Sequence, residues 1–341
     1  MEPGSGAYSP MNSNSPKRDR EMSDRSTVSL YIPCYNGEQY IAACIEGVLG
    51  QFRKPDEIFV IDDGSTDRTA EIASSFSQVT VIRHEVNSGL SAARNTAIRA
   101  ATGDFVAALD ADCHADKLWL YTLLQVMKSL PESVVGIGGK LVEEFNESPA
   151  DEFRAIFMSQ HKGDEPLSNP GYVAGANTMF RRSALLEVGG YHEAFRTNGE
   201  DVLICRKLKA RGYSIVYDPR AVVNHQRRDT PASVVRMNWA HWRYPMAILT
   251  PMTNLGRVWL RMQMRTTYGI QLLRVIVKMR KYRLLGIGLR CLLVTPFWEL
   301  RDWWRIKRDK AEDRYEQIAK DARTLSLRPL ESSAVPLETH N

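Results

Sequence analysis

The chain has 341 residues, of which 43% are hydrophobic and 25% charged, and its formal net charge is +5. It is long enough for one large domain, or for one domain with an appended subdomain, and its composition is that of a globular protein. The five cysteines form no C-x-x-C pair, which argues against a disulfide framework or a zinc site and fits a reducing cytosol. The acidic residues crowd into the first two thirds and the basic residues into the last, so any basic patch is local, and we expect no nucleic-acid partner.

The first 25 residues are polar and rich in Ser, Pro and Asn. They lack the apolar core of a signal peptide, and we expect residues 1–25 to form a disordered tail.

From Val28 onward, short β-branched or aromatic runs alternate with segments of helical periodicity. This alternation predicts a layered α/β fold with a mostly parallel sheet flanked by helices. The expected strands are 28–32, 57–61, 79–82, 105–109, 134–141, 172–180 and 214–217. The expected helices follow Asn36-Gly37 and span 90–101 and about 200–210.

Three polar clusters follow expected strands, at residues 33–36, 62–67 and 110–112. Ligands of open α/β sheets bind beyond the carboxyl ends of the strands, where such loops converge. The clusters therefore indicate a nucleotide-sized site.

Asp62 and Asp63 open a loop in which Ser65 or Thr66 can cap the next helix. A carboxylate at that place can also accept a hydrogen bond from a uracil ring N–H or from ribose hydroxyls. We expect both roles to share the loop.

Asp110 and Asp112 place two carboxylates after a buried strand. A nucleotide diphosphate would be repelled by them unless a cation intervened. Carboxylate and phosphate oxygens are the usual ligands of Mg²⁺ and Mn²⁺, so the pair predicts a divalent metal site.

Glu200 and Asp201 begin an expected helix, where acidic residues also complement the helix dipole. The functional alternative makes one of these carboxylates the general base that removes the acceptor proton. His225 follows an apolar run and is either structural or a metal ligand. Arg94 either occupies a solvated helix face or binds phosphate or the base edge.

Together these residues resemble the family 2 glycosyltransferases, which have the GT-A fold. The matching segments are 28–38 (VSLYIPCYNGE), 60–67 (VIDDGSTD), 87–95 (NSGLSAARN), 103–112 (GDFVAALDAD) and 199–208 (GEDVLICRKL). They occur in the family's order and spacing across about 28–226.

The resemblance implies roles for individual residues. Asp201 would be the catalytic base, with Glu200 beside it. Asp110, Asp112 and His225 would hold Mn²⁺ or Mg²⁺. The donor-binding residues would be Pro33, Tyr35, Asn36, Glu38, Asp62, Asp63, Arg94, Asp110 and Ala111, with Pro33, Tyr35 and Asp63 at the nucleobase and Arg94 close to it.

The expected activity is inverting, metal-dependent transfer from a nucleotide-diphosphate sugar, with UDP as the expected nucleotide, to a hydroxyl of a glycan or lipid-linked glycan in polysaccharide biosynthesis. Gln226 begins no Q-x-x-R-W motif of the processive synthases, which favours single additions or short chains. Two alternatives stay open: a sugar-phosphate nucleotidylyltransferase, and a catalytically inactive module that binds nucleotide sugars or membranes.

Beyond Pro245, one helical stripe carries Leu255, Val258, Trp259 and Met262, and another carries Arg257, Arg261 and Arg265. Such basic amphipathic helices either lie on an anionic membrane or cap the catalytic domain. We divide the chain into the tail 1–25, a GT-A catalytic domain at 26–245, a basic helical extension at 246–315 and a polar tail at 316–341. We expect a cytoplasmic protein that can be peripheral on the cytoplasmic face of the membrane.

Overall fold

The computed structural model describes residues 26–242, 252 and 254–308. The expected tails 1–25 and 316–341 therefore lie outside the described residues, as do 246–251, 253 and 309–315 of the expected extension.

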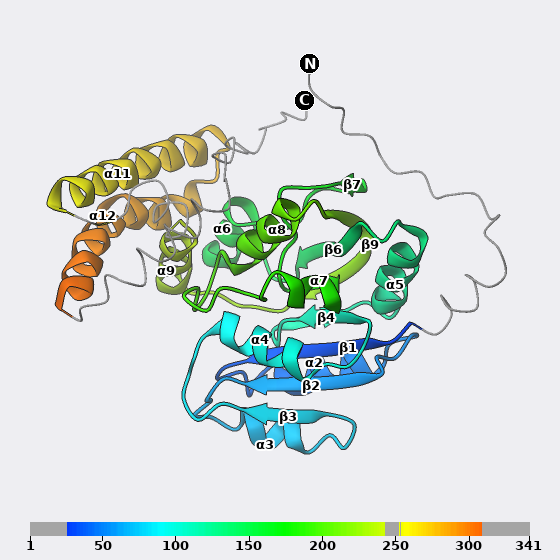
Figure 1. The fold of residues 1–341 in the computed structure, drawn as a ribbon. Helices are drawn as coiled ribbons and strands as arrows, with labels where there is room; N and C mark the ends of the chain where they lie inside the picture. Colours follow the sequence, from blue (N-terminus) through cyan, green and yellow to red (C-terminus); the bar gives the residue numbers. More distant parts are fainter. Residues whose placement is uncertain (1–25, 243–251, 253, 309–341) are drawn as a thin grey trace.

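One mixed sheet forms the centre of the fold (Figure 1). Its strands are β1 (Val28–Cys34), β2 (Glu57–Asp62), β3 (Thr80–Arg83), β4 (Phe105–Leu109), β5 (Cys113–Ala115), β6 (Val134–Glu143), β7 (Leu167–Ser168), β8 (Asn177–Arg181) and β9 (Ser214–His225). The strand order is β3-β2-β1-β4-β8-β6-β9-β5, and β7 also pairs with β9. The β3-β2-β1-β4 half and the β6-β9 pair are parallel, whereas β8, β5 and β7 run antiparallel to their neighbours.

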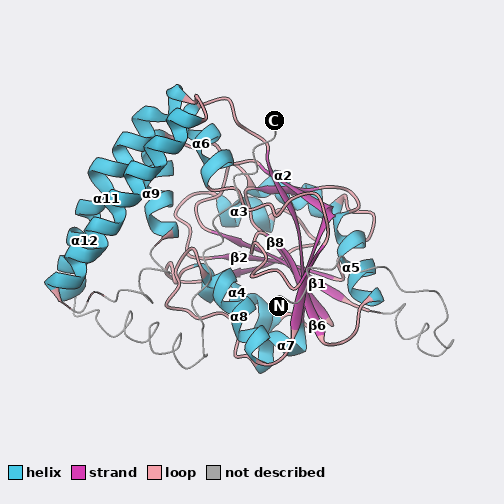
Figure 2. Cartoon of the chain, turned by 90° about the horizontal axis from the view of Figure 1, so that it is seen from above, coloured by secondary structure: helices cyan, strands magenta, loops and turns pink. Residues whose placement is uncertain are grey.

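Helices cover both faces of the sheet, as Figure 2 shows. They are α2 (Ile41–Leu49), α3 (Thr69–Ser74), α4 (Leu90–Ala100), α5 (Trp119–Ser129), α6 (Pro149–Phe157), α7 (Arg182–Glu187), α8 (Glu200–Ala210), α9 (Pro231–His241), α11 (Leu255–Lys278) and α12 (Leu285–Arg308), with a 3₁₀ turn η1 (Tyr282–Leu284). Successive strand residues point to opposite faces. Leu30 and Ile32 pack with α2, α3 and α5, whereas Tyr31 packs with α4, α7 and α8. The predicted α/β fold is confirmed.

Two expected strands differ from the observed ones by more than two residues at one end. The strand expected at 172–180 is only β8, because the Gly175 backbone bonds to the side chains of Arg94 and Asp201 instead of to a ladder. The strand expected at 214–217 continues to His225, and its pairing with β6 shifts register between Gly139 and Lys140.

The C-terminal helices α11 and α12 lie side by side as an antiparallel hairpin against α9 (Figures 1 and 2). A third core of residues from α6, α9, α11 and α12 joins this hairpin to the sheet domain.

The basic stripe expected on α11 is only partly exposed, which corrects the sequence-based prediction. Arg257 is exposed, but Arg261 and Arg265 are buried and ion-paired with the buried Glu299 of α12, at 2.7 and 2.8 Å. Unpaired charges are costly to bury, so these arginines fasten α11 to α12 and take no part in a solvent-facing surface.

Candidate active site

The strands β1, β2 and β4 are parallel neighbours, so the loops that follow them meet at one edge of the sheet. Asn36 and Glu38 join the first two loops. The Asn36 side-chain oxygen accepts a hydrogen bond from the Thr66 backbone N–H at 2.9 Å, and Glu38 accepts one from the Arg68 N–H at 3.1 Å. Both residues therefore fix the shape of this edge.

Asp62 and Asp63 are almost fully buried. Asp62 accepts a hydrogen bond from the Ser65 N–H and pairs with Arg83 at 3.1 Å. Asp63 accepts from the backbone N–H groups of Ser88 and Gly89, at 2.8 and 2.7 Å, and contacts His84. Asp63 thus orders the loop before α4, a structural role that the sequence reading did not assign to it.

Tyr35 and Pro33 differ in accessibility. Pro33 is buried within β1, whereas the Tyr35 side chain at the end of that strand is 50% exposed. Tyr35 is therefore the aromatic ring at this edge that a planar ligand can reach.

Arg94 lies at the centre of the site and is 1% exposed. Its guanidinium donates to Asp110 Oδ1 at 3.1 Å, to the Gly175 carbonyl at 2.9 Å and to the Tyr31 hydroxyl at 3.2 Å, and its Nε lies 3.7 Å from Glu200. The structure excludes the solvated-face alternative. It also puts the Arg94 charge beside Asp110 and Glu200.

Asp110 and Asp112 follow β4 with Ala111 between them, and their side chains are 29% and 24% exposed. Burial raises the pKa of Asp110, and the Arg94 charge opposes this shift only in part. Burial acts in the same direction on Asp112, but the hydrogen bond and charge of His225 outweigh it and lower the Asp112 pKa. Asp112 is thus the more readily ionised of the two.

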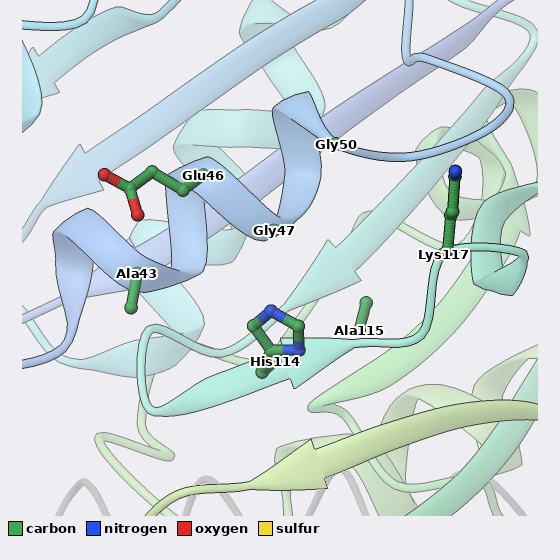
Figure 3. Close-up of a pocket in the computed structure, with 7 residues that line it drawn as sticks. All are labelled: Ala43, Glu46, Gly47, Gly50, His114, Ala115 and Lys117. Carbon is green, nitrogen blue, oxygen red and sulfur yellow. The ribbon is translucent and has the colours of Figure 1, made fainter.

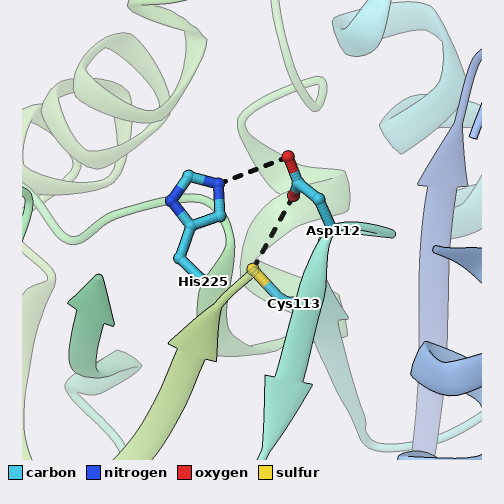
Figure 4. A group of neighbouring side chains, drawn as sticks. All are labelled: Asp112, Cys113 and His225. Atoms are coloured by element: carbon cyan, nitrogen blue, oxygen red, sulfur yellow. Dashed lines mark hydrogen bonds and ion pairs between the residues drawn. The ribbon is translucent and has the colours of Figure 1, made fainter. Parts of the chain in front are cut away.

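His225 ends β9 and faces Asp112, with His225 Nε2 3.3 Å from Asp112 Oδ2 (Figure 4). Its Nδ1 lies 3.0 Å from Glu143, which is paired in turn with the buried Arg154 at 2.8 Å. Burial opposes a charge on His225, but the bonds to Asp112 and Glu143 prevail and raise its pKa to about 10. A metal at this histidine would therefore displace a proton.

These side chains fit a hard divalent cation. Asp112 offers a carboxylate as a ligand. Glu143 bonds to Nδ1 of His225 and thereby orients the ring so that Nε2 faces the Asp112 carboxylate; metal-binding histidines are commonly oriented by a carboxylate in this way. Cys113 is also within 4.8 Å of both. Burial raises the pKa of the Cys113 thiol, and Mn²⁺ and Mg²⁺ prefer oxygen ligands, so we do not count it as a ligand.

Glu200 and Asp201 occupy the first turn of α8, whose preceding residue Gly199 has φ +91°. The buried Glu200 has its pKa raised to about 8 by burial and by the Asp201 charge. Asp201 is partly exposed and accepts hydrogen bonds from the Val202 N–H at 2.8 Å and the Gly175 N–H at 3.3 Å. Asp201 is thus the more accessible of the two carboxylates.

Gly175 joins the two halves of the site. Its carbonyl accepts from Arg94 while its N–H donates to Asp201, and a Cβ at this residue would lie 2.8 Å from Arg94 Nη2. The sequence reading missed Gly175, Tyr31 and Glu143. No motif marked Gly175 or Glu143, and the predicted strand at 134–141 ended before Glu143; Tyr31 lies within the matching segment 28–38 but was given no role.

A separate cavity of about 330 Å³ lies between α2 and β5 (Figure 3). Its lining residues are Ala43, Glu46, Gly47, Gly50, His114, Ala115 and Lys117. None of the predicted site residues lines it.

Residues 29–189 match the family described as glycosyl transferase family 2. The chain is 30% identical over 209 residues to a pre-mycofactocin glycosyltransferase of Mycobacterium tuberculosis, which covers 59% of the chain and 43% of that protein. It is 27% identical over 216 residues to a glucosyl-dolichyl phosphate glucuronosyltransferase of Haloferax volcanii, covering 58% and 69%. A poly-beta-1,6-N-acetyl-D-glucosamine synthase of Staphylococcus aureus is 26% identical over 213 residues, covering 60% and 51%. The chain thus spans less than half the length of the mycobacterial relative.

Among solved structures, the chain is similar to GalNAc-T7 with UDP, GalNAc and Mn²⁺, at 19% identity and a TM-score of 0.49, covering 65% of the chain and 51% of that protein. It is also similar to S. aureus TarS 1-349, at 20% identity and a TM-score of 0.49, covering 87% and 91%.

The helices α11 and α12 are the longest in the described part of the chain, and no helix there is both long enough and apolar enough to span a bilayer.

Proposed function

We propose that this chain is a family 2 glycosyltransferase that transfers a sugar from a nucleotide-diphosphate donor to a hydroxyl acceptor with inversion at the anomeric carbon. The observation that carries the proposal is one network of contacts. Arg94 contacts both Asp110 and Glu200, and the Gly175 peptide connects Arg94 to Asp201. A strand-end acidic pair and a helix-start carboxylate, 91 residues apart in the chain, thereby share one network.

The donor nucleotide in this proposal is UDP. The exposed Tyr35 ring, which follows β1, supplies a stacking surface, and the proposed acceptor for the uracil ring N–H is the carboxylate of Asp63, which follows the paired strand β2. Pro33, Asn36, Glu38 and Asp62 shape the loops around this position.

Asp110, Asp112 and His225 would hold a divalent cation, Mn²⁺ or Mg²⁺. When bound, the ion would neutralise charge on the leaving diphosphate. Arg94 and Ala111 belong to the donor side of the site, where Arg94 keeps the Asp110 carboxylate oriented.

Asp201 is the proposed general base. Direct displacement needs one carboxylate to take the acceptor proton as the hydroxyl oxygen attacks. Two backbone N–H groups hold the Asp201 side chain, and the Gly175 peptide connects it to Arg94. Glu200 has a supporting role, because it is buried against Arg94.

The acceptor in this proposal is a glycan or a lipid-linked glycan. The names of the relatives from H. volcanii and S. aureus describe a dolichyl phosphate-linked sugar and a polysaccharide, respectively. We further propose polysaccharide biosynthesis at the cytoplasmic face of an anionic membrane, with the chain bound peripherally.

Two alternatives are less well supported. A sugar-phosphate nucleotidylyltransferase would need a basic, glycine-rich loop after the first strand, and residues 33–37 contain no cation. A catalytically inactive module would have no need for both Asp112 and Asp201.

Thermal shift with a panel of nucleotide sugars in the presence of Mn²⁺ tests the donor, because binding to the folded state raises its stability. We expect UDP and a UDP-sugar to give the largest shift, and Tyr35→Ala to reduce it. Tighter binding of GDP than of UDP by calorimetry would refute the UDP assignment.

A further inference from the structure

The outward face of α12 carries an uninterrupted apolar stripe. Five side chains, between 41% and 65% exposed, follow one another at intervals of three or four residues: Leu289, Leu293, Phe297, Leu300 and Trp304. This spacing aligns them along about 22 Å of one helix face. The opposite face, with Cys291, Thr295, Glu299 and Ile306, is buried. The stripe is therefore a surface that the described residues leave exposed.

The surface around the stripe carries charge of one sign. In residues 254–308 the acidic residues are Glu299 and Asp302, and both are buried. The exposed basic residues of α12 include Arg290, Arg301, Arg305, Lys307 and Arg308, and those of α11 include Arg257, Arg274 and Lys278. Arg290 and Arg301 follow Leu289 and Leu300 directly, about 100° round the helix, so they border the stripe. Trp259 of α11, which is 61% exposed, lies at the same end of the antiparallel hairpin as Trp304.

The hairpin is attached firmly to the rest of the structure. Glu299 accepts a hydrogen bond from the Trp239 indole N–H of α9 at 2.9 Å, and Arg265 donates to the Trp239 carbonyl at 2.9 Å. Lys281 and Arg283 pair with Glu152 of α6 at 2.9 and 2.8 Å. A partner held by the hairpin is thus held at a fixed place relative to the sheet.

We propose that the α12 stripe and its basic border form a docking surface for an anionic lipid bilayer, with α12 lying in the plane of the headgroups. An apolar face with bordering arginines and exposed tryptophans is the pattern of interfacial helices. A second copy of the chain fits less well, because a two-fold contact through this face would bring two basic borders together. The inference rests on the proposed function and locates its membrane partner on the outward face of α12.

Flotation of the full chain with vesicles tests this surface. The vesicles are phosphatidylcholine alone, or phosphatidylcholine mixed with phosphatidylglycerol. Removing two inserted apolar side chains in Leu293→Ser/Phe297→Ser should lower the partition coefficient on mixed vesicles by about 100-fold. The matched control is Phe52→Ser in the sheet domain, because Phe52 and Phe297 are both 65% exposed; it should bind like the parent.

The basic border has its own test. Arg290→Gln/Arg301→Gln should reduce binding to mixed vesicles roughly 5-fold per arginine and leave binding to phosphatidylcholine unchanged. All these side chains are exposed, so the melting temperatures of the variants should equal that of the parent. If one double variant melts at a lower temperature, its two single substitutions are tested instead.

Unchanged flotation of Leu293→Ser/Phe297→Ser would overturn the proposal. So would a dimer of the parent chain, seen in sedimentation equilibrium, that the same variant abolishes, because the stripe would then serve a second copy. The vesicle assay contains neither donor nor acceptor, so its outcome is independent of sugar transfer.

Discussion

Replacing Arg94 by lysine tests whether the buried guanidinium organises the site. Arginine bonds at once to Asp110, the Gly175 carbonyl and the Tyr31 hydroxyl. Lysine keeps the charge but has a single nitrogen, so it cannot reproduce the planar fork. A lost charge-assisted hydrogen bond costs about 1.5–3 kcal/mol, and a buried polar group left unsatisfied costs about 1–3 kcal/mol.

We therefore expect Arg94→Lys to lower the free energy of unfolding by about 2–4 kcal/mol, which corresponds to a fall in melting temperature of roughly 3–6 °C in a chain of this size. Turnover should fall as well, even well below the melting temperature, because Gly175 links Arg94 to Asp201. Arg94→Met removes the charge too, and breaking a buried pair costs about 3–5 kcal/mol.

The effect of Arg94→Met should shrink toward acidic pH. Asp110 and Glu200 have raised pKa values, so both take up protons as the pH falls and then need no counter-charge. The assay is thermal unfolding together with single-turnover transfer, and the control is Arg99→Lys on the exposed face of the same helix. An Arg94→Lys variant with the parent's melting temperature and turnover would refute the reasoning.

Two further predictions concern the carboxylates. Asp112→Ala should abolish the stabilisation by Mn²⁺, which for the parent is about 2.7 kcal/mol when the ion is at 100 times its Kd. The control Glu132→Ala, at an exposed residue, should keep this stabilisation. Full transfer activity of the parent in excess EDTA would contradict a role for the metal. For Glu200 the folded-state pKa of about 8 exceeds the unfolded value of about 4.3, so the folded chain holds a proton that the unfolded chain releases between these pH values. Its contribution to the free energy of unfolding therefore falls by about 1.4 kcal/mol per pH unit in this window. Glu200→Gln should flatten that decline in urea unfolding without metal, and a parallel decline in both proteins would contradict the raised pKa.

Local sequence patterns predicted the parallel half of the sheet and the acidic strand ends. Residues 58–61 and 105–109 are continuous apolar runs, and the carboxylates of Asp62 and Asp110 follow directly where those runs stop. These features depend on neighbours in the chain, so they can be predicted from periodicity.

Long-range pairings could not be predicted in this way. Helical spacing places Arg261 and Arg265 on one stripe of the helix. It does not show whether that stripe faces solvent or another helix, because their partner Glu299 lies more than 30 residues away in the chain. The same holds for Arg94, whose buried guanidinium bonds to Tyr31 and Gly175, 63 and 81 residues away in the chain. Tertiary packing decides which face of a helix is covered, and a periodic pattern only shows that faces differ.

The contact of His225 with Glu143 depends on strand register. It needs β6 and β9 to pair across a shift at Gly139 and Lys140. A single-residue change of register turns a side chain to the other face of the sheet, and the sequence does not mark the shift.

The most direct test of the proposed mechanism is transfer by Asp201→Asn. Asparagine keeps the size of the side chain and one acceptor oxygen, which can serve the 2.8 Å bond from the Val202 N–H, but it loses the longer bond from the Gly175 N–H and cannot take the acceptor proton. We expect transfer to fall by roughly 10² to 10⁴ while calorimetry shows unchanged donor binding, and the parent's product to have the inverted anomeric configuration by NMR. Near-normal turnover by Asp201→Asn, or a retained configuration, would contradict the assignment of Asp201 as the general base of an inverting transfer.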